Sequence, residues 1–391
     1  FEIAKQTLEH YDEICEEDLR SLGQLTELRH ELRKHSPLAE TNVMKLYSYI
    51  DELLDSIKDH GTPQFTRQAR CAFMARSFCR TLVEKGYFTK QEMDDFMLSI
   101  PTVASEFERD FDLYSHGKLS RDDFNHLYGH LRLGTYDIRS DSYRNIYFDV
   151  ASANLTGNNK VKQEAKSLDL ERLQVALDEA GIPVTPEKFI EFIKKATQNR
   201  EYFKFEFTKS LSLMLDVIVK LGEVMAIARE DMSYLEIQDL LSYHSRDSYI
   251  QTIETRRRFY HVNSYLVLPE VIFDVGDIDV IDIDEARPNF ITNKVVEAPI
   301  VNLDEDHDSD ITGKIVVLTK ADPGYDWIFA KDIAGFVTKY GGAASHMAIR
   351  CAEFGIPAAI GCGEKIYQRI HRMQIMCLDC ENGRITEKQS Q

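Results

Sequence analysis

Residues 335–363, GFVTKYGGAASHMAIRCAEFGIPAAIGCG, constrain the fold of this chain more than any other stretch. An apolar run enters a Gly341-Gly342 turn, and Ser345 and His346 follow it. The next residues have helical spacing, and a Gly-Ile-Pro turn then leads into a second apolar run. This order predicts a strand, a glycine turn, a helix, a second turn and a second strand, with His346 in the first turn of the helix.

A histidine at this position is a candidate phosphocarrier. The first turn of a helix has backbone N–H groups without intrahelical acceptors and the positive end of the helix dipole, so it can receive a phosphoryl group carried on the imidazole. Glycines let the backbone approach an anion closely, and neighbouring hydroxyl and ammonium groups add further donors. The predicted phosphate-binding residues are Thr338, Lys339, Gly341, Gly342 and Ser345. The alternative is a histidine that merely fills the start of a helix. The glycine turn, the histidine and the helix start in this order make that alternative less favoured.

The segment resembles the phosphohistidine domain of the phosphoenolpyruvate-utilising enzymes, which include phosphoenolpyruvate synthase, pyruvate phosphate dikinase and the rifampicin phosphotransferases. Their shared pattern is roughly GG-x-x-S/C-H-x-A-I-x-A-R-x-x-G-I-P-A. The matching positions are Gly341, Gly342, Ser345, His346, Ala348, Ile349, Glu353, Gly355, Ile356, Pro357 and Ala358. The resemblance implies that His346 carries the phosphoryl group on a small domain that swivels between two sites.

The chain departs from this pattern at two places. Arg350, Cys351 and Ala352 stand where the family has a variable residue followed by Ala-Arg. Ala344 stands where several dikinases carry a regulatory threonine, so regulation by phosphorylation at that position is not expected.

Length and charge limit the remaining possibilities. A chain of 391 residues is long enough for two or three domains with separate cores. Its net charge of −18 argues against nucleic acid or an anionic membrane as a partner, because both need a concentrated positive face. No apolar run approaches the roughly 20 residues that cross a bilayer. Seven scattered cysteines suit reduced thiols, so we expect a cytoplasmic protein.

The resemblance implies a second domain outside this sequence. In the family an ATP-grasp domain loads the histidine, and neither that domain nor a GxxxxGK[ST] phosphate loop is found here. The chain starts with FEIAKQ, so we expect a fragment that is inactive with ATP alone. ATP and Mg²⁺ are expected on the missing ATP-grasp domain of the same polypeptide.

No metal site is predicted within this chain. Cys377 and Cys380 form a CxxC pair without a second pair to complete four zinc ligands. The acidic tract 304–310 contains a histidine, but a charged loop is the favoured interpretation.

The sequence predicts a multidomain α and α/β protein. A large, mostly α-helical acceptor domain is expected over residues 1–262, with Thr89 and Thr185 as helix N-caps. A connector with short strands is expected over 263–302. Alternating strands and helices then predict a small swivelling α/β phosphohistidine domain over 303–391.

Three helical-region segments, at 128–138, 200–209 and 229–235, combine charged, aromatic and glycine residues. They resemble the acceptor region of the same family. GHLRLGTYDI, REYFKFEFTK and the run ADPGYDWIF (321–329) are similar to the branch that phosphorylates the side-chain amide of L-glutamine in capsule polysaccharide (phosphoramidate) biosynthesis. The candidate acceptor-binding residues are His130, Arg132, Tyr136, Asp137, Arg200, Glu201 and Lys204.

Other functions stay open at this point. The same chemistry could act on a hydroxyl acceptor such as an antibiotic, and the chain could instead be a non-catalytic phosphocarrier or regulatory module. Pyruvate is disfavoured because the family places its pyruvate site on a C-terminal barrel, and this sequence ends soon after the histidine domain.

Overall fold

The computed structural model describes residues 2–145, 167–263, 274–275, 288–305, 309–343 and 345–388. The chain forms two compact units, each assembled from two separate stretches. Unit 1 comprises Phe1–Arg109 and Thr156–Met225, and unit 2 comprises Asp110–Leu155 and Ala226–Gln391. The domain boundaries expected from the sequence remain predictions, and these units divide the chain differently.

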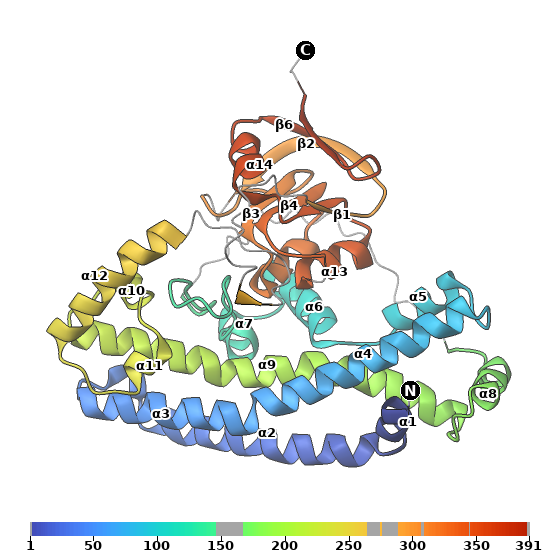
Figure 1. The fold of residues 1–391 in the computed structure, drawn as a ribbon, viewed down its shortest axis with the longest axis horizontal. Coiled ribbons are helices and arrows are strands. Elements are labelled where there is room, and N and C mark those ends of the chain that lie inside the picture. The colour runs from blue at the N-terminus through green and yellow to red at the C-terminus, as the bar shows by residue number, and fades with distance from the viewer. Residues whose placement is uncertain are drawn as a thin grey trace. The chain divides into compact units, whose positions relative to one another are not determined.

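Unit 1 is helical (Figure 1). Its helices are α1 (Glu2–Glu9), α2 (Tyr11–Lys34), α3 (Val43–His60), α4 (Thr62–Glu84), α5 (Lys90–Leu98), α8 (Leu170–Glu179) and α9 (Pro186–Val224), with a short 3₁₀ turn, η1 (Pro37–Ala39). The long helix α9 contacts α2, α3, α4 and α8. Helix α6 (Val103–Ser115) runs across the boundary between the two units.

Local signals define the ends of these helices. The hydroxyl of Thr89 accepts from the backbone of Glu92, whose carboxylate accepts in return from the Thr89 backbone, so the two form a capping box. Thr185 caps α9 through the Lys188 N–H at 3.3 Å. Both predicted N-caps are therefore confirmed.

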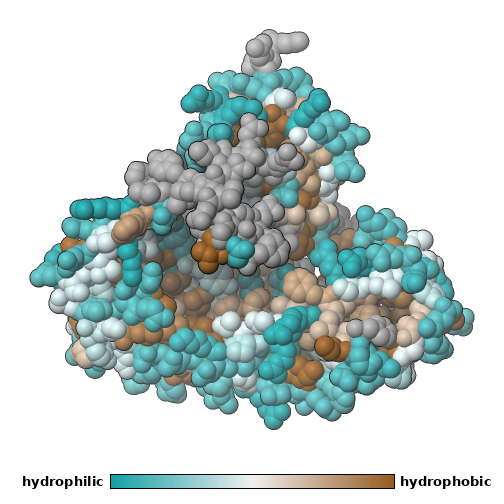
Figure 2. All heavy atoms as spheres, viewed as in Figure 1, coloured by the Kyte–Doolittle hydropathy of each residue, from teal (hydrophilic) through white to brown (hydrophobic). Residues whose placement is uncertain are grey.

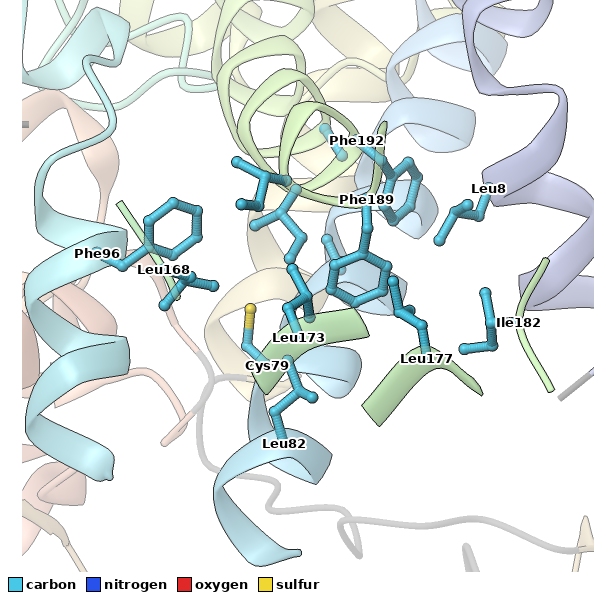
Figure 3. Close-up of a cluster of buried hydrophobic side chains, with 14 of the residues drawn as sticks. Leu8, Cys79, Leu82, Phe96, Leu168, Leu173, Leu177, Ile182, Phe189 and Phe192 are labelled. Atoms are coloured by element: carbon cyan, nitrogen blue, oxygen red, sulfur yellow. The ribbon is translucent and has the colours of Figure 1, made fainter. Parts of the chain in front are cut away.

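The core of unit 1 includes a cluster of side chains from six helices (α1, α2, α4, α5, α8 and α9) and the turns between them (Figure 3). Leu8 of α1, Phe96 of α5 and Phe189 of α9 contribute to it. Leu173 and Leu177 of α8 also point into it, and none of these five side chains is more than 2% exposed. The predicted helical region thus buries one apolar face of each helix, as amphipathic helices require.

Unit 2 contains helices and one mixed sheet. Its described helices after α6 are α7 (Arg121–Tyr128), α10 (Arg229–Met232), α11 (Ile237–Leu240), α12 (Arg246–Asn263), α13 (His346–Phe354) and α14 (Gly363–Ile370), with a 3₁₀ segment, η3 (Pro323–Ala330). The described strands are β1 (Asn289–Ile291), β2 (Val295–Asn302), β3 (Ile315–Lys320), β4 (Gly335–Tyr340), β5 (Ala358–Ile360), β6 (Ile375–Asp379) and β7 (Arg384–Glu387).

The strand order is β1-β5-β4-β3-β2-β6-β7. Strands β2, β3, β4 and β5 are parallel neighbours, whereas β1, β6 and β7 pair antiparallel at the two sides. The central strands β3 to β5 are almost continuously buried, which is typical of parallel strands covered on both faces. The sheet therefore starts before residue 303, because β1 and β2 lie in the segment predicted as a connector.

Hydrophilic residues cover most of the visible surface of the strand-rich part (Figure 2). None of the helices in the described ranges is both long and apolar enough to cross a membrane. Residues 264–273 and 276–287 of the predicted connector lie outside the described residues, as does Ala344.

Candidate functional site

The segment around His346 folds as the sequence predicts. Strand β4 ends at Tyr340, Ser345 is the N-cap of α13, and His346 is the first residue of that helix. The Ser345 hydroxyl accepts from the Ala348 N–H at 3.4 Å. The helix ends at Gly355, whose φ of +64° is left-handed, and β5 follows. The predicted order of strand, turn, helix, turn and strand is confirmed.

The turn itself depends on glycine. Gly341 has a φ of +136°, which L side chains rarely adopt. A Cβ at this position would also lie 2.9 Å from the Cβ of Ala321 and 3.0 Å from Cγ2 of Ile360. The backbone between β4 and α13 can therefore pass close to its neighbours only because residue 341 has no side chain.

His346 is held by a carboxylate that the sequence analysis did not single out. Its Nε2 lies 2.7 Å and 2.8 Å from the two carboxylate oxygens of Asp326, which lies in η3. The side chains of His346 and Asp326 are only 15% and 19% exposed. Because water screens such a pair poorly, the Asp326 carboxylate strongly favours an orientation of the imidazole with a hydrogen on Nε2.

Arg350 also lies near this carboxylate. Its Nε is 3.9 Å from Asp326 Oδ1, and it stands one turn after His346 on α13. The guanidinium packs over the rings of Phe354 and Phe329 and pairs with Glu353 at 3.3 Å. Arg350 thus supplies a positive charge one helical turn from the imidazole, at a position that the sequence analysis noted only as a departure from the family pattern.

Two of the predicted phosphate-binding side chains have other partners. Thr338 is fully buried, and its hydroxyl accepts from the Gly361 N–H at 3.2 Å. Lys339 forms an ion pair with Glu364 of α14 and lies over the Tyr340 and Tyr367 rings. Their roles in holding phosphate stay predictions, as do those of Gly341, Gly342 and Ser345.

The first group of predicted acceptor residues lies in the loop 129–145 of unit 2. His130 and Arg132 are buried. Arg132 Nη1 donates a hydrogen bond of 2.6 Å to the Ser140 carbonyl and so joins two parts of the loop. Tyr136 is 59% exposed. Hydrogen bonds from Arg139 lower the pKa of Asp137 to about 2, so its carboxylate is a weak base at neutral pH.

The second group lies on α9 of unit 1. Arg200 and Lys204 are one turn apart and half-buried. The Arg200 guanidinium lies 3.7 Å from the Glu201 carboxylate and stands over the ring of Phe73. A joint role of the two groups in one acceptor site stays a prediction.

In the described parts of the chain, no group of three or more His, Cys, Asp or Glu side chains is placed to hold a metal ion. Cys377 lies on β6, and the Cys380 thiol is directed at the Ala358 carbonyl at 3.5 Å. Part of the acidic tract, 306–308, lies outside the described residues, and Asp304 accepts hydrogen bonds from Tyr325 and Tyr367.

Comparison with known proteins agrees with this geometry. Residues 311–383 match the family model of the PEP-utilising enzyme mobile domain. The chain is 28% identical over 222 residues to the rifampicin phosphotransferase of Bacillus subtilis, a match that covers 51% of this chain and 24% of that protein. The rifampicin phosphotransferase of Bacillus cereus is 26% identical over 212 residues, which is 49% of this chain and 24% of the relative. The matched stretch thus spans about a quarter of the length of either relative.

Proposed function

We propose that this chain contains the phosphocarrier and acceptor parts of a phosphotransferase, with His346 as the residue that carries the phosphoryl group. The observation that supports this most directly is the position of His346. It is the first residue of α13, directly after the glycine turn, and its imidazole lies against Asp326 within the stretch that matches the mobile domain. A nucleophilic imidazole with an orienting carboxylate is suited to a covalent intermediate.

The role of Asp326 follows from which ring nitrogen it contacts. With the hydrogen on Nε2, the carboxylate accepts that hydrogen and the lone pair available for attack is on Nδ1. Attack through Nε2 requires the proton to leave and the carboxylate to move away from that nitrogen. In both cases the N–P bond forms as the bond from phosphorus to the leaving oxygen breaks, and first-turn N–H groups of α13 can receive the phosphoryl oxygens.

The phosphoryl group is proposed to come from ATP bound on an ATP-grasp domain of the same polypeptide. When His346 attacks the β-phosphorus, the bond to the α-phosphate breaks and AMP leaves; water cleaves the bond between the β- and γ-phosphates, so that the γ-phosphate leaves as inorganic phosphate and the β-phosphoryl group stays on His346. Mg²⁺ is proposed to bind together with ATP on that same domain.

We infer L-glutamine as the acceptor, giving N-phosphoglutamine. The support is the similarity of GHLRLGTYDI, REYFKFEFTK and ADPGYDWIF to the glutamine-phosphorylating branch. An amide nitrogen is a poor nucleophile because its lone pair is delocalised, so the site needs a base and cations. Arg200 and Lys204 on α9 are the better cation candidates, because Arg132 is buried and bonded to Ser140.

A hydroxyl acceptor is the second candidate. It is favoured by the similarity to two rifampicin phosphotransferases over about half of this chain. In this case the acceptor oxygen, not an amide nitrogen, attacks the phosphohistidine.

The experiment that tests these proposals loads the chain without ATP. Phosphoramidate, a small chemical phosphoryl donor, is incubated with the protein, and the product is followed by phosphorus NMR. His346→Asn is the control. We expect phosphate on residue 346, located by peptide mapping, in the wild type and none there in the variant, since asparagine has no nucleophilic ring nitrogen; the other eleven histidines are the same in both proteins. Glutamine, asparagine and rifampicin are then offered as acceptors.

Each outcome distinguishes one proposal. A new N–P signal that appears only with glutamine supports the amide kinase, and phosphate on rifampicin alone supports the hydroxyl acceptor. A loaded His346 that transfers to none of these compounds removes both acceptors and favours a carrier module. Loading that is unchanged in His346→Asn rules out the carrier role.

A further inference from the structure

The loop 129–145 contacts the segment that leads from β3 into η3, although about 190 residues separate them in sequence. The backbone N–H of Thr135 lies 3.2 Å and 3.3 Å from the two carboxylate oxygens of Asp322, and the Thr135 hydroxyl lies 3.0 Å from one of them. The same carboxylate accepts from the Gly324 N–H at 2.9 Å. One side chain therefore both caps η3 and binds the loop.

Gly324 makes this contact possible. A Cβ at Gly324 would overlap the carbonyl oxygen of Arg132 and lie 2.7 Å from the carbonyl carbon of Leu133, closer than the 3.0 Å that real Cβ atoms keep. The two backbones thus touch directly. The Tyr143 hydroxyl donates to the Gly324 carbonyl, and the Tyr143 side chain is only 1% exposed.

The loop is held in shape by its own bonds. Tyr143 N–H donates to the Leu131 carbonyl at 2.8 Å, and Arg132 forms a bridge with Ser142. Arg229 of α10 donates to the Ile138 carbonyl at 2.6 Å and forms an ion pair with Asp141. At the edge of the contact, Lys320 lies 3.4 Å from Asp137.

The residues held by the loop lie close in sequence to the carboxylate that holds His346. Asp322 and Gly324 are held by the loop, and Asp326, two residues further along the same 3₁₀ segment, holds His346. Because these residues belong to one short segment, a loop that fixes the start of η3 also fixes the Asp326 carboxylate that orients the imidazole.

We propose that the loop 129–145 is a docking element that clasps residues 320–324 and thereby positions Asp326 against His346. The contact joins two stretches of the same compact unit through hydrogen bonds and one close backbone approach. The docking contact itself does not depend on the proposed function; only its consequence for phosphoryl transfer rests on it.

Hydrogen exchange followed by mass spectrometry tests the docking contact. We compare the wild type with Gly324→Ala, in which the added Cβ must push Arg132 away. We expect amide exchange in the loop peptides to become about 10-fold faster or more, while strands β3 and β4 exchange as in the wild type. Gly23→Ala is the matched control, because no atom lies within 4 Å of a Cβ there. Unchanged loop exchange in a folded Gly324→Ala protein overturns the proposal.

A milder variant covers the case in which Gly324→Ala does not fold. Tyr143→Phe removes only the hydroxyl that donates to Gly324, so the loop should exchange roughly 5-fold faster, as expected for one lost hydrogen bond. Loop exchange equal to the wild type in this variant contradicts the clasp.

Phosphorylation of His346 by phosphoramidate distinguishes the docking proposal from the proposed carrier function. If the loop is protected but His346 never becomes phosphorylated, the docking contact stands and the proposed function fails. If His346 is phosphorylated equally fast in wild type and in Gly324→Ala with a mobile loop, the carrier role stands and the positioning effect is removed.

Discussion

At the scale of single residues, the main feature is a shared carboxylate. Asp326 lies between the imidazole of His346 and the guanidinium of Arg350, and all three side chains are less than one-fifth exposed. An ionised carboxylate in such a place is stabilised by the nearby arginine and can orient the imidazole without being neutralised by it. The proposed phosphocarrier site thus combines two residues of α13 and one of η3.

Replacement of the carboxylate tests this arrangement. Asp326→Asn keeps the size of the side chain but cannot accept a proton or stabilise a positive imidazole, so we expect phosphorylation of His346 by phosphoramidate to slow roughly 10²-fold. Rates are measured by phosphorus NMR, with Asp332→Asn as the control. An Asp326→Asn protein that loads at the wild-type rate would show that the pair is only structural.

The cysteines give a second prediction at this scale. Six of the seven are buried, and burial raises the pKa of Cys71 and Cys380 to about 11 and that of Cys79 and Cys362 to about 12. Cys377 is half-buried. A thiol reagent should therefore modify one residue quickly in the native protein and the others only after unfolding. Cys377→Ser should abolish the fast phase, and a fast phase that persists in this variant contradicts the burial pattern.

At the scale of elements, the sequence predicts local structure well. The Ser345 cap, the glycine turn and the caps at Thr89 and Thr185 all depend on residues within a few positions of each other. By contrast, Asp326 contacts His346 across 20 residues, and Asp322 contacts Thr135 across about 190 residues. No spacing rule predicts such contacts from the sequence. The run ADPGYDWIF (321–329) is similar to the family, but no local pattern indicates that Asp326 contacts His346.

The loop 129–145 also gives a pH prediction. Arg139, chiefly, lowers the pKa of Asp137 from 3.8 to about 2, so the folded state favours the ionised form. The resulting stability is fully present above the ordinary pKa of 3.8 and is lost as the pH falls towards 2. The difference in unfolding free energy between wild type and Asp137→Asn should therefore shrink between pH 4 and pH 2. Urea unfolding at several pH values measures it, and a difference that is constant with pH contradicts the ion pair.

At the scale of the whole molecule, the two units have separate cores. The helical class of the N-terminal region and the α/β class of the C-terminal region follow from apolar periodicity, which changes from helical spacing to short β-branched runs. The sequence could not predict that the loop 129–145 belongs with the sheet-containing unit, because residues 110–155, which contain it, lie in sequence between α5 and α8 of the other unit. Nor does periodicity show that β1 and β2 join the sheet.

A core substitution tests the assigned hydrophobic core of unit 1. Phe189 is 1% exposed and packs against Phe78, with ring centroids 5.5 Å apart. Phe189→Ala should lower the unfolding free energy of this unit by about 3–5 kcal/mol. Phe73→Ala, at a side chain that is 57% exposed, should cost about 1 kcal/mol or less. Hydrogen exchange in α4, α8 and α9 measures the effect, and equal losses from the two substitutions would contradict the assigned core.

Each unit is made of two stretches of chain, and this interleaving has a consequence for how the protein is synthesised and inherited. A ribosome releases α2, α3 and α4 long before α9, which contacts all three, so the helical core stays incomplete until residues near 225 have emerged. Likewise, no single cut in the gene separates the two units, because residues 110–155 of unit 2 lie between the two stretches of unit 1, and residues 156–225 of unit 1 lie between the two stretches of unit 2. Recombination of one continuous gene segment can therefore transfer the whole histidine-bearing unit only together with residues 156–225 of the helical unit, which lie between its two stretches in sequence.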